Sequence, residues 1–253
     1  MIDLHCHLLP GVDDGAKKVE QSVKVLRALA SQGVTDICLT PHLRASQAGE
    51  GPPASHDRAF AALTPEAPPT PRLHRGAEVM LDRPLTTRPE QLRQITLAGT
   101  RYILVEFPRM VALETVTIAL TRIRESGLIP LLAHPERYSC CSVDSVSRWR
   151  SVGAYMQVDG PTLPTRQARG QRARDLVSHG LADIIAGDNH GDERSMAEGH
   201  RFLLMQEAPE QAALLTRTNP AAILADGTPV PVPPMTIRNT WVQRLRNLLE
   251  RDE

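Results

Sequence analysis

Seven short apolar segments, each followed by residues with helical periodicity, constrain the fold of this chain more than any other feature. Between the first two segments, for example, apolar residues recur at Val19, Val23 and Leu26. Strands that alternate with helices pair in parallel, because each helix carries the chain back across the sheet. The sequence therefore predicts an α/β fold, and 253 residues favour a seven-stranded TIM-like barrel. The predicted strands span residues 2–7, 34–40, 73–80, 102–105, 128–133, 154–158 and 182–186.

The composition favours one globular domain with a short additional tail. Basic and acidic residues number 29 each, which gives no support for a nucleic-acid partner or an anionic membrane surface. No apolar run approaches the roughly 20 residues that span a bilayer, and no secretory peptide precedes the first strand, so we expect a cytoplasmic protein. We expect the barrel over residues 1–226. Residues 227–253 read as a Pro-rich segment and an amphipathic helix that packs on the same domain.

Acidic and imidazole side chains follow six of the seven predicted strands, and the segment 154–158 is the exception. The carboxyl ends of barrel strands meet at one mouth, so these side chains are expected to lie together. Without cations they would repel and desolvate one another, which predicts a metal centre. Nine potential ligands exceed the roughly four that one zinc ion takes, so two or three ions are expected. The candidates are His5, His7, His42, Glu78, Glu106, His134, Asp188 and His190, with Asp14 from the first loop.

A cysteine nucleophile is the weaker interpretation of the same region. Cys38 and Arg44 have the Cys-x5-Arg spacing of cysteine-dependent phosphatases. Such a loop must wrap phosphate in backbone N–H groups, but this one contains Pro41, which has none, and no glycine. The four cysteines are expected to be reduced thiols.

Taken together, the motifs at these strand ends resemble the polymerase-and-histidinol-phosphatase superfamily. Within it the chain most resembles the bacterial manganese-dependent tyrosine-protein phosphatases encoded with capsule and exopolysaccharide genes, over roughly residues 1–225. The resemblance implies a distorted (β/α)7 barrel that holds three metal ions. Residues 44–72 match no family motif. The matching motifs are Ile-Asp-Leu-His-Cys-His at 2–7, Asp-Asp-Gly at 13–15, Thr-Pro-His at 40–42, Gly-Ala-Glu at 76–78, Val-Glu-Phe-Pro at 105–108, Ala-His-Pro-Glu-Arg-Tyr at 133–138 and Gly-Asp-Asn-His at 187–190.

The resemblance also implies a role for each candidate. Two arginines would bind phosphate: Arg137, in the His-Pro-Glu-Arg-Tyr motif, and Arg194, six residues after Asp188. The implied substrate is a phosphotyrosine protein, namely the tyrosine-rich C-terminal tail of a bacterial tyrosine kinase that controls polysaccharide export. The implied ligand sets are His5, His7, Glu78 and Asp188 for the first ion, Glu78, Glu106 and His134 for the second, and Asp14, His42 and His190 for the third.

Imidazole and carboxylate ligands without a thiolate suit Mn²⁺, with Zn²⁺ or iron as alternatives. We expect a metal-bound hydroxide to attack phosphorus in line, while Arg137 and Arg194 neutralise the phosphate oxygens. Two other functions stay open: a phosphoesterase of the same superfamily acting on histidinol phosphate or nucleotides, and a metal-stabilised regulatory module without turnover. An amidohydrolase is disfavoured, because those enzymes commonly rely on a fourth-strand lysine where this chain has Glu106. The sequence leaves the oligomeric state open.

Overall fold

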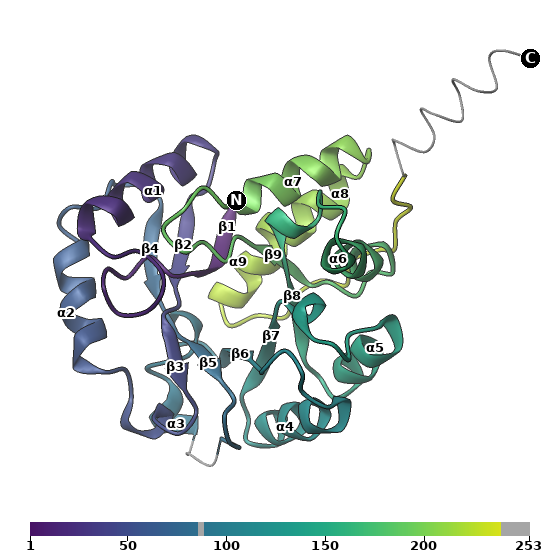
Figure 1. Ribbon diagram of the computed structural model, residues 1–253, viewed down its shortest axis with the longest axis horizontal. Coiled ribbons are helices and arrows are strands. Elements are labelled where there is room, and N and C mark those ends of the chain that lie inside the picture. The colour runs from purple at the N-terminus through teal and green to yellow at the C-terminus, as the bar shows by residue number, and fades with distance from the viewer. Residues whose placement is uncertain (86–88, 239–253) are drawn as a thin grey trace, which may run out of the picture.

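The computed structural model describes residues 1–85 and 89–238 and shows parallel strands flanked by helices (Figure 1). Each pair of neighbouring strands within a described sheet is parallel. This confirms the α/β fold that the strand and helix alternation predicted. The strands are β1 (Ile2–Cys6), β2 (Asp36–Leu39), β3 (His42–Arg44), β4 (Arg72–Arg75), β5 (Glu78–Met80), β6 (Tyr102–Glu106), β7 (Ile129–Ala133), β8 (Tyr155–Asp159) and β9 (Ile184–Ala186).

The described strands form two sheets, in the orders β1-β2-β4 and β3-β5-β6-β7-β8-β9, and neither sheet closes on itself. The prediction of one closed seven-stranded barrel is therefore not confirmed. The reason is local, because the third predicted strand, 73–80, breaks in two, and the second, 34–40, is followed by a short strand that the sequence did not predict. Pro41, which has no N–H to donate, separates β2 from β3, and residues 76–77 separate β4 from β5.

The ends of the two sheets nevertheless meet beside β1. The Asp188 N–H donates to the His5 carbonyl at 3.0 Å, and the His7 N–H donates to the Asn189 carbonyl at 2.7 Å. These bonds join the end of β1 to the residues that follow β9. They bring the histidines of the first strand and the acidic loop after the last strand to the same place.

Helices cover the outside of the sheets (Figure 1). Two of them begin at serines that accept a hydrogen bond from the first turn: Ser142 from the Ser145 N–H, and Ser195 from the Ala197 N–H. A π-helical turn, Leu214–Thr218, joins α8 to α9. The helices are α1 (Val19–Ser31), α2 (Ala54–Leu63), α3 (Pro89–Leu92), α4 (Leu113–Glu125), α5 (Val143–Ser151), α6 (Ala168–Ser178), α7 (Met196–Met205), α8 (Pro209–Ala213) and α9 (Asn219–Leu224).

The described residues bury two hydrophobic clusters. The larger includes side chains of the helices, such as Leu120 and Trp149, while the smaller includes Tyr102 and Leu104 of β6. Because side chains alternate along a strand, Glu106 lies on the same face of β6 as Tyr102 and Leu104. One face of this strand thus passes from apolar packing to a carboxylate at its C-terminal end.

The Pro-rich segment runs along the body of the protein as far as residue 238. The Tyr102 hydroxyl donates to the Gly227 carbonyl at 2.6 Å, and the Met235 N–H donates to the Ser178 carbonyl at 2.9 Å. The predicted terminal helix, with Trp241, lies outside the described residues, so the proposed division at residue 226 stays a prediction. Among the helices of residues 1–85 and 89–238, none has the length and apolarity needed to cross a membrane.

Replacing Leu104 by Ala should lower the free energy of unfolding by roughly 2–5 kcal/mol, because the fully buried side chain would leave a cavity in the smaller cluster. Urea denaturation of the purified protein measures the change. The matched control is Ile118→Ala on α4, where the side chain is 50% exposed and the loss should be well below that of Leu104→Ala. Equal losses at the two positions would contradict the described packing.

Candidate metal centre

The nine side chains proposed as ligands lie together. Most come from the C-terminal ends of strands or the loops that follow them, whereas His42 and Glu78 begin β3 and β5. Six of them line a pocket of about 520 Å³: Asp14, His42, Glu78, Glu106, Asp188 and His190. The other three, His5, His7 and His134, are buried and contact the carboxylates of that lining. The structure therefore places the nine residues in one cluster. They come from six separate parts of the sequence, because His5, His7 and Asp14 share one part and Asp188 and His190 share another.

Glu78, at the start of β5, lies at the centre of the cluster. Its fully buried carboxylate has four imidazole groups around it. Oε2 lies 3.3 Å from the Nε2 atoms of both His5 and His7 and 3.0 Å from His42 Nδ1, and Oε1 lies 2.9 Å from His134 Nε2. Both oxygens of this carboxylate therefore face imidazoles that come from separate parts of the chain.

Asp188, in the loop after β9, faces His5 of β1 and His7, the residue that follows β1. Its Oδ1 lies 3.3 Å from His5 Nε2 and 3.4 Å from His7 Nε2. The two histidine Nε2 atoms are themselves 3.1 Å apart. Three potential ligand atoms thus point to one position between the sheets.

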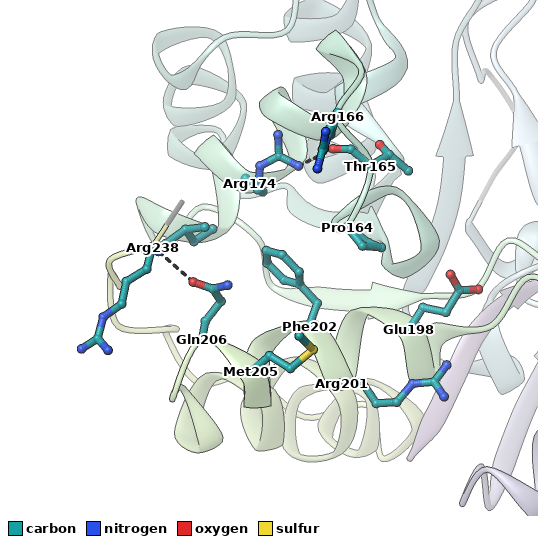
Figure 2. A pocket seen from close by; sticks show the side chains of 11 residues that line it. Pro164, Thr165, Arg166, Arg174, Glu198, Arg201, Phe202, Met205, Gln206 and Arg238 are labelled. Carbon is teal, nitrogen blue, oxygen red and sulfur yellow. Dashed lines mark hydrogen bonds between the residues drawn. The ribbon is translucent and has the colours of Figure 1, made fainter. Parts of the chain in front are cut away.

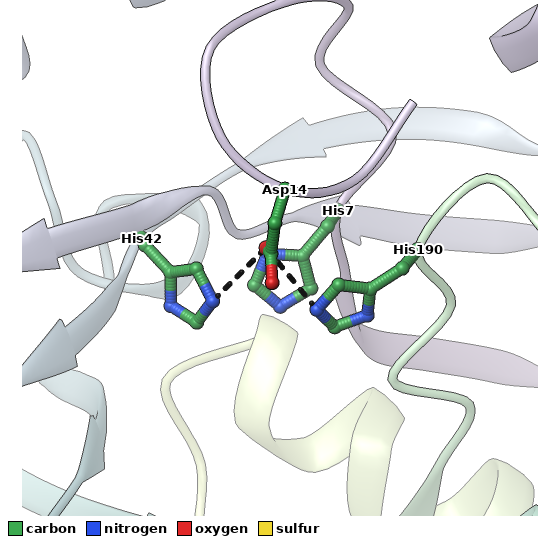
Figure 3. Close-up of side chains that lie close together, drawn as sticks. All are labelled: His7, Asp14, His42 and His190. Carbon is green, nitrogen blue, oxygen red and sulfur yellow. Dashed lines mark ion pairs between the residues drawn. The ribbon is translucent and has the colours of Figure 1, made fainter. Parts of the chain in front are cut away.

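A second part of the cluster lies nearer to the solvent. Figure 3 shows Asp14 between His42 and His190, with His7 beside them. Asp14 Oδ1 lies 3.4 Å from the Nε2 atoms of both His42 and His190, and the rings of His7 and His190 stack with centroids 4.1 Å apart. Asp14 itself is exposed, so this part of the cluster opens to the pocket.

Every one of the nine residues belongs to at least one group whose ligand atoms lie within 4.8 Å of one another. Three such groups are clear in the geometry described above, and a fourth joins His42 to Glu78 and Glu106. The grouping differs in part from the implied sets, because His7 joins Asp14, and His42 lies 3.2 Å from Glu106 while His134 lies 3.9 Å from it. How the ligands divide among ions stays a prediction.

The chemistry of the buried atoms fits divalent cations. Glu78 Oε2, Glu106 Oε1, Asp188 Oδ1 and His134 Nδ1 are buried without a hydrogen-bond partner among the described residues. An unpartnered buried polar atom costs free energy, and a native structure rarely keeps several of them side by side. Oxygen and imidazole nitrogen are the donors that Mn²⁺, Zn²⁺ and iron accept, so coordination would satisfy the three carboxylate oxygens. His134 faces the carboxylates through Nε2, so its Nδ1 atom would need another partner.

The electrostatic potential of the cluster favours positive charge. Burial opposes protonation of His5, yet the negative charges of Glu78 and Asp188 raise its pKa to about 9. Burial likewise opposes protonation of His42, and Glu106 and Glu78 raise its pKa to about 10. The same carboxylates that stabilise a proton on these rings would stabilise a metal ion, which requires the neutral imidazole.

The backbone at two strand ends is left-handed. His134 has φ = 34° and Asp188 has φ = 46°, a region that few residues other than glycine adopt. His134 directly follows β7, and Asp188 lies two residues after the end of β9. The conformation turns each side chain into the cluster, and strained conformations of this kind often occur at functional sites.

The two arginines proposed to bind phosphate both approach Asp188 Oδ2 but line different pockets. Arg137 lines the pocket and forms ion pairs with Asp188 Oδ2 and, at 3.1 Å, with Asp159 Oδ2. Arg194 Nη1 lies 3.7 Å from Asp188 Oδ2, but its Nε donates to Asp192 at 2.7 Å, and the side chain lines a neighbouring pocket beside α1. Of the two, Arg137 faces the pocket directly.

The strand predicted to contribute nothing, β8, supplies two residues behind the cluster. Gln157 Oε1 accepts a hydrogen bond from His5 Nδ1 at 2.9 Å, which leaves His5 Nε2 directed at the carboxylates. Gln157 Nε2 donates to Asp159 Oδ1 at 2.9 Å, and Asp159 holds Arg137. Both residues are buried and lie on the same face of β8. Asp159 directly follows the predicted segment 154–158, so the interpretation of this strand as the exception was wrong. Gln157 was missed because only acidic and imidazole side chains were considered as candidates.

Asp13, next to the predicted ligand Asp14, orients a second histidine. Its Oδ2 accepts a hydrogen bond from His7 Nδ1 at 2.8 Å, so His7 presents Nε2 to the cluster. The loop must approach closely for this contact, and a Cβ at Gly15 would lie 2.0 Å from the His7 carbonyl oxygen. Carboxylates and amides that fix the tautomer of a ligand histidine are typical of metal centres.

Cys38 does not have the surroundings of a nucleophile. It is fully buried on β2 in the smaller hydrophobic cluster, and burial raises the pKa of its thiol to about 12. A reactive cysteine needs a lowered pKa and access to the substrate. The structure therefore agrees with the sequence analysis, which disfavoured a thiol mechanism.

Comparison with known sequences decides the family. The sequence model described as "Capsular polysaccharide synthesis, CpsB/CapC" matches residues 1–225. The chain belongs to the CpsB/CapC family. This confirms the resemblance drawn from the strand-end motifs.

Two curated relatives within the CpsB/CapC family are named as tyrosine-protein phosphatases. CpsB of Streptococcus pneumoniae is 27% identical over 240 residues, which cover 89% of this chain and 99% of that protein. YwqE of Bacillus subtilis is 26% identical over 247 residues, which cover 94% of this chain and 97% of that protein. The similarity thus extends over nearly the full length of each relative.

A solved structure from a study of YwqE from Bacillus subtilis and CpsB from Streptococcus pneumoniae has the same fold. It superposes with a TM-score of 0.78 at 26% sequence identity, over 94% of this chain and 100% of that chain. Those two proteins are described as unique metal-dependent tyrosine phosphatases. Metal dependence is therefore a property of relatives with this architecture.

Replacing Gln157 by Leu should weaken metal binding by about 10–100-fold, because the bond that fixes the His5 tautomer would be lost. Competition with a chromophoric chelator measures the affinity without reference to turnover. Gln171→Leu on the exposed side of α6 is the matched control and should leave the affinity unchanged. Equal affinities in the wild type and Gln157→Leu would contradict this role.

Proposed function

We propose that this CpsB/CapC family protein is a metal-dependent protein-tyrosine phosphatase. The observation that carries the proposal is the convergence of nine oxygen and nitrogen ligands on one pocket that Arg137 also lines. Metal ligands beside a guanidinium suit the hydrolysis of a phosphate monoester, since both neutralise phosphate charge. The names of the relatives add the substrate class, phosphotyrosine.

The residues of the cluster would hold two or three divalent cations, with three favoured. Mn²⁺ is our first choice, because the donors are imidazoles and carboxylates without a thiolate, and Zn²⁺ or iron are the alternatives. When bound, such ions supply a hydrolytic nucleophile at neutral pH, because coordination lowers the pKa of water. Glu78 is proposed as the bridging ligand, since its two oxygens face imidazoles of four different residues.

Arg137 is proposed to bind the phosphate of the substrate. Its guanidinium is held between Asp188 and Asp159, which fixes the direction in which its remaining N–H groups point. A planar guanidinium can donate two parallel hydrogen bonds to phosphate, whereas lysine offers a point charge. Arg194 is proposed as the second phosphate ligand, and it would have to exchange its bond to Asp192 for the substrate.

The mouth of the pocket suits an aromatic phosphate. Leu43 and Met80 give apolar surface beside the cluster, and Arg44 and Gln47 line the pocket beside them. The tyrosine phenolate, with a pKa of about 10, is a tolerable leaving group, so a strong general acid is not required. No covalent phosphoenzyme is needed either, which agrees with the buried position of Cys38.

The physiological substrate is proposed to be a phosphotyrosine protein, namely the tail of a bacterial tyrosine kinase that regulates capsule or exopolysaccharide synthesis. The capsular context comes from the description of the family. We propose that the reaction takes place in the cytoplasm. Histidinol phosphate and other small phosphate esters are the competing substrate class, and the following measurement separates them.

The purified protein should contain about two to three equivalents of metal and release phosphate from phosphotyrosine peptides much faster than from phosphoserine peptides or histidinol phosphate. The expected preference is at least about tenfold in kcat/KM, equivalent to about 1.4 kcal/mol of differential transition-state binding. Elemental analysis and a phosphate-release assay give the two quantities. Equal rates on the three substrates would exclude the tyrosine assignment, and turnover in a fully chelated preparation would exclude metal dependence.

Replacing His134 by Ala should lower kcat at least about 100-fold, because Glu78 and Glu106 would lose a shared imidazole partner. Cys38→Ala is the control and should leave kcat nearly unchanged. Phosphate release from a phosphotyrosine peptide at saturating metal measures both variants. A large loss in Cys38→Ala with metal still bound would instead support a thiol nucleophile.

A further inference from the structure

A second pocket lies outside the metal centre, between α6 and α7 (Figure 2). We call it the α6–α7 groove. One wall consists of residues 164–166 and Arg174, and the other is the face of α7 with Arg201, Phe202 and Met205. Arg238 lies at one end, and the volume is about 450 Å³. That volume is within the roughly 300–1,000 Å³ typical of ligand sites.

The α6–α7 groove is basic, although the whole chain carries no net charge. Four arginines line it, Arg166, Arg174, Arg201 and Arg238, against one acidic residue, Glu198. Arg238 forms an ion pair with Glu207 at 2.7 Å, so the basic character comes mainly from the other three. Arg174 is anchored by donating to the carbonyls of Leu163 and Thr165, at 2.8 and 2.5 Å, which gives this wall a fixed positive charge. Clustered charge of one sign attracts segments of the opposite sign and orients them.

The same groove exposes apolar surface. Figure 2 shows the Phe202 ring directed from α7 toward the opposite wall, where Pro164 and Arg174 lie. Met205, which also lines the groove, is 76% exposed. Aromatic residues, methionine and arginine are the side chains enriched in protein interfaces. This combination suits a ligand that carries both acidic and apolar side chains.

Each wall of the groove is joined to the metal centre by a short stretch of chain. Arg166 precedes Arg169 by three residues, and Arg169 forms an ion pair with the same Asp159 that holds Arg137. On the other wall, Glu198 follows Arg194 by four residues, and Arg194 lies 3.7 Å from Asp188. The ten residues of α7 span about 15 Å, so roughly five residues of extended peptide could follow the helix away from the pocket.

We propose that the α6–α7 groove binds an acidic, aromatic-containing segment of the phosphoprotein whose phosphotyrosine enters the metal centre. This inference rests on the proposed function and extends it, because it assigns substrate affinity to residues that do not touch the reacting phosphate. Binding in the groove would raise the local concentration of each phosphotyrosine near the pocket. A small phosphate ester, which cannot reach the groove, would gain nothing from it.

The test uses the full chain with Arg166→Glu and Arg201→Glu combined, since both side chains are exposed. The control combines Arg27→Glu and Arg122→Glu, which make the same change in net charge on exposed positions of α1 and α4. Two substrates are compared: a phosphotyrosine peptide with about eight acidic and aromatic residues flanking the phosphotyrosine, and free phosphotyrosine. Thermal melts verify that all variants fold.

We expect the groove variant to raise KM for the long peptide by about fivefold or more, with kcat and the free phosphotyrosine kinetics unchanged. This corresponds to about 1 kcal/mol of binding free energy. Fluorescence anisotropy of the same peptide without its phosphate should show a matching loss of affinity, and wild-type binding should weaken as salt is added. The control variant should behave like the wild type.

Each other outcome has a separate meaning. Equal KM changes in the groove and control variants, or no binding of the unphosphorylated peptide by the wild type, would overturn the docking proposal while leaving the phosphatase assignment intact. Peptide binding without any phosphate release would overturn the proposed function alone. A dimer that only the groove variant disrupts would show that a second copy of the chain occupies the groove, and would also overturn the proposal.

Discussion

The attraction between buried carboxylates and imidazoles at the strand ends is the constraint on which the rest of the site depends. Glu78 is fully buried and Asp188 nearly so, and each charge would be costly to desolvate alone. His5 and His7 lie 3.3–3.4 Å from both. Positive charge at the centre of this arrangement stabilises it, and the raised pKa values of His5 and His42 reflect that attraction. Several of the carboxylate oxygens lack a hydrogen bond, which leaves them open to a further positive charge.

The fold achieves this assembly through parallel pairing and two interruptions. Parallel strands bring their carboxyl ends to one side, so ligands from distant parts of the chain meet there. Pro41 separates the second predicted strand from β3, and residues 76–77 interrupt the third predicted strand. His42 and Glu78 follow these breaks directly. As a result, the strands form two sheets instead of one. Two of the proposed ligands, His42 and Glu78, lie where the chain passes from the end of one strand to the start of the next.

Buried residues of β8, behind the proposed ligands, hold the side chains of the site in position. Gln157 and Asp159 of β8 link His5 to Arg137 through buried hydrogen bonds. The imidazole that faces the proposed metals and the guanidinium that faces the proposed phosphate are therefore positioned by one strand. In the proposed phosphatase, metal binding and phosphate binding would depend on the same buried contacts.

The sequence alone determined the α/β class, the nine candidate ligands and the family, because strand alternation fixes which residues stand at strand ends and the motifs keep their order. It did not determine the division into two sheets, since pairing depends on partners far along the chain. Nor did it identify Gln157, whose hydrogen bond to His5 spans 152 residues of sequence. Tertiary packing also decided that the Arg194 side chain bonds to Asp192 and that α6 lies beside α7. The periodicity of a sequence predicts which face of a helix is buried, but it does not predict which element packs against that face.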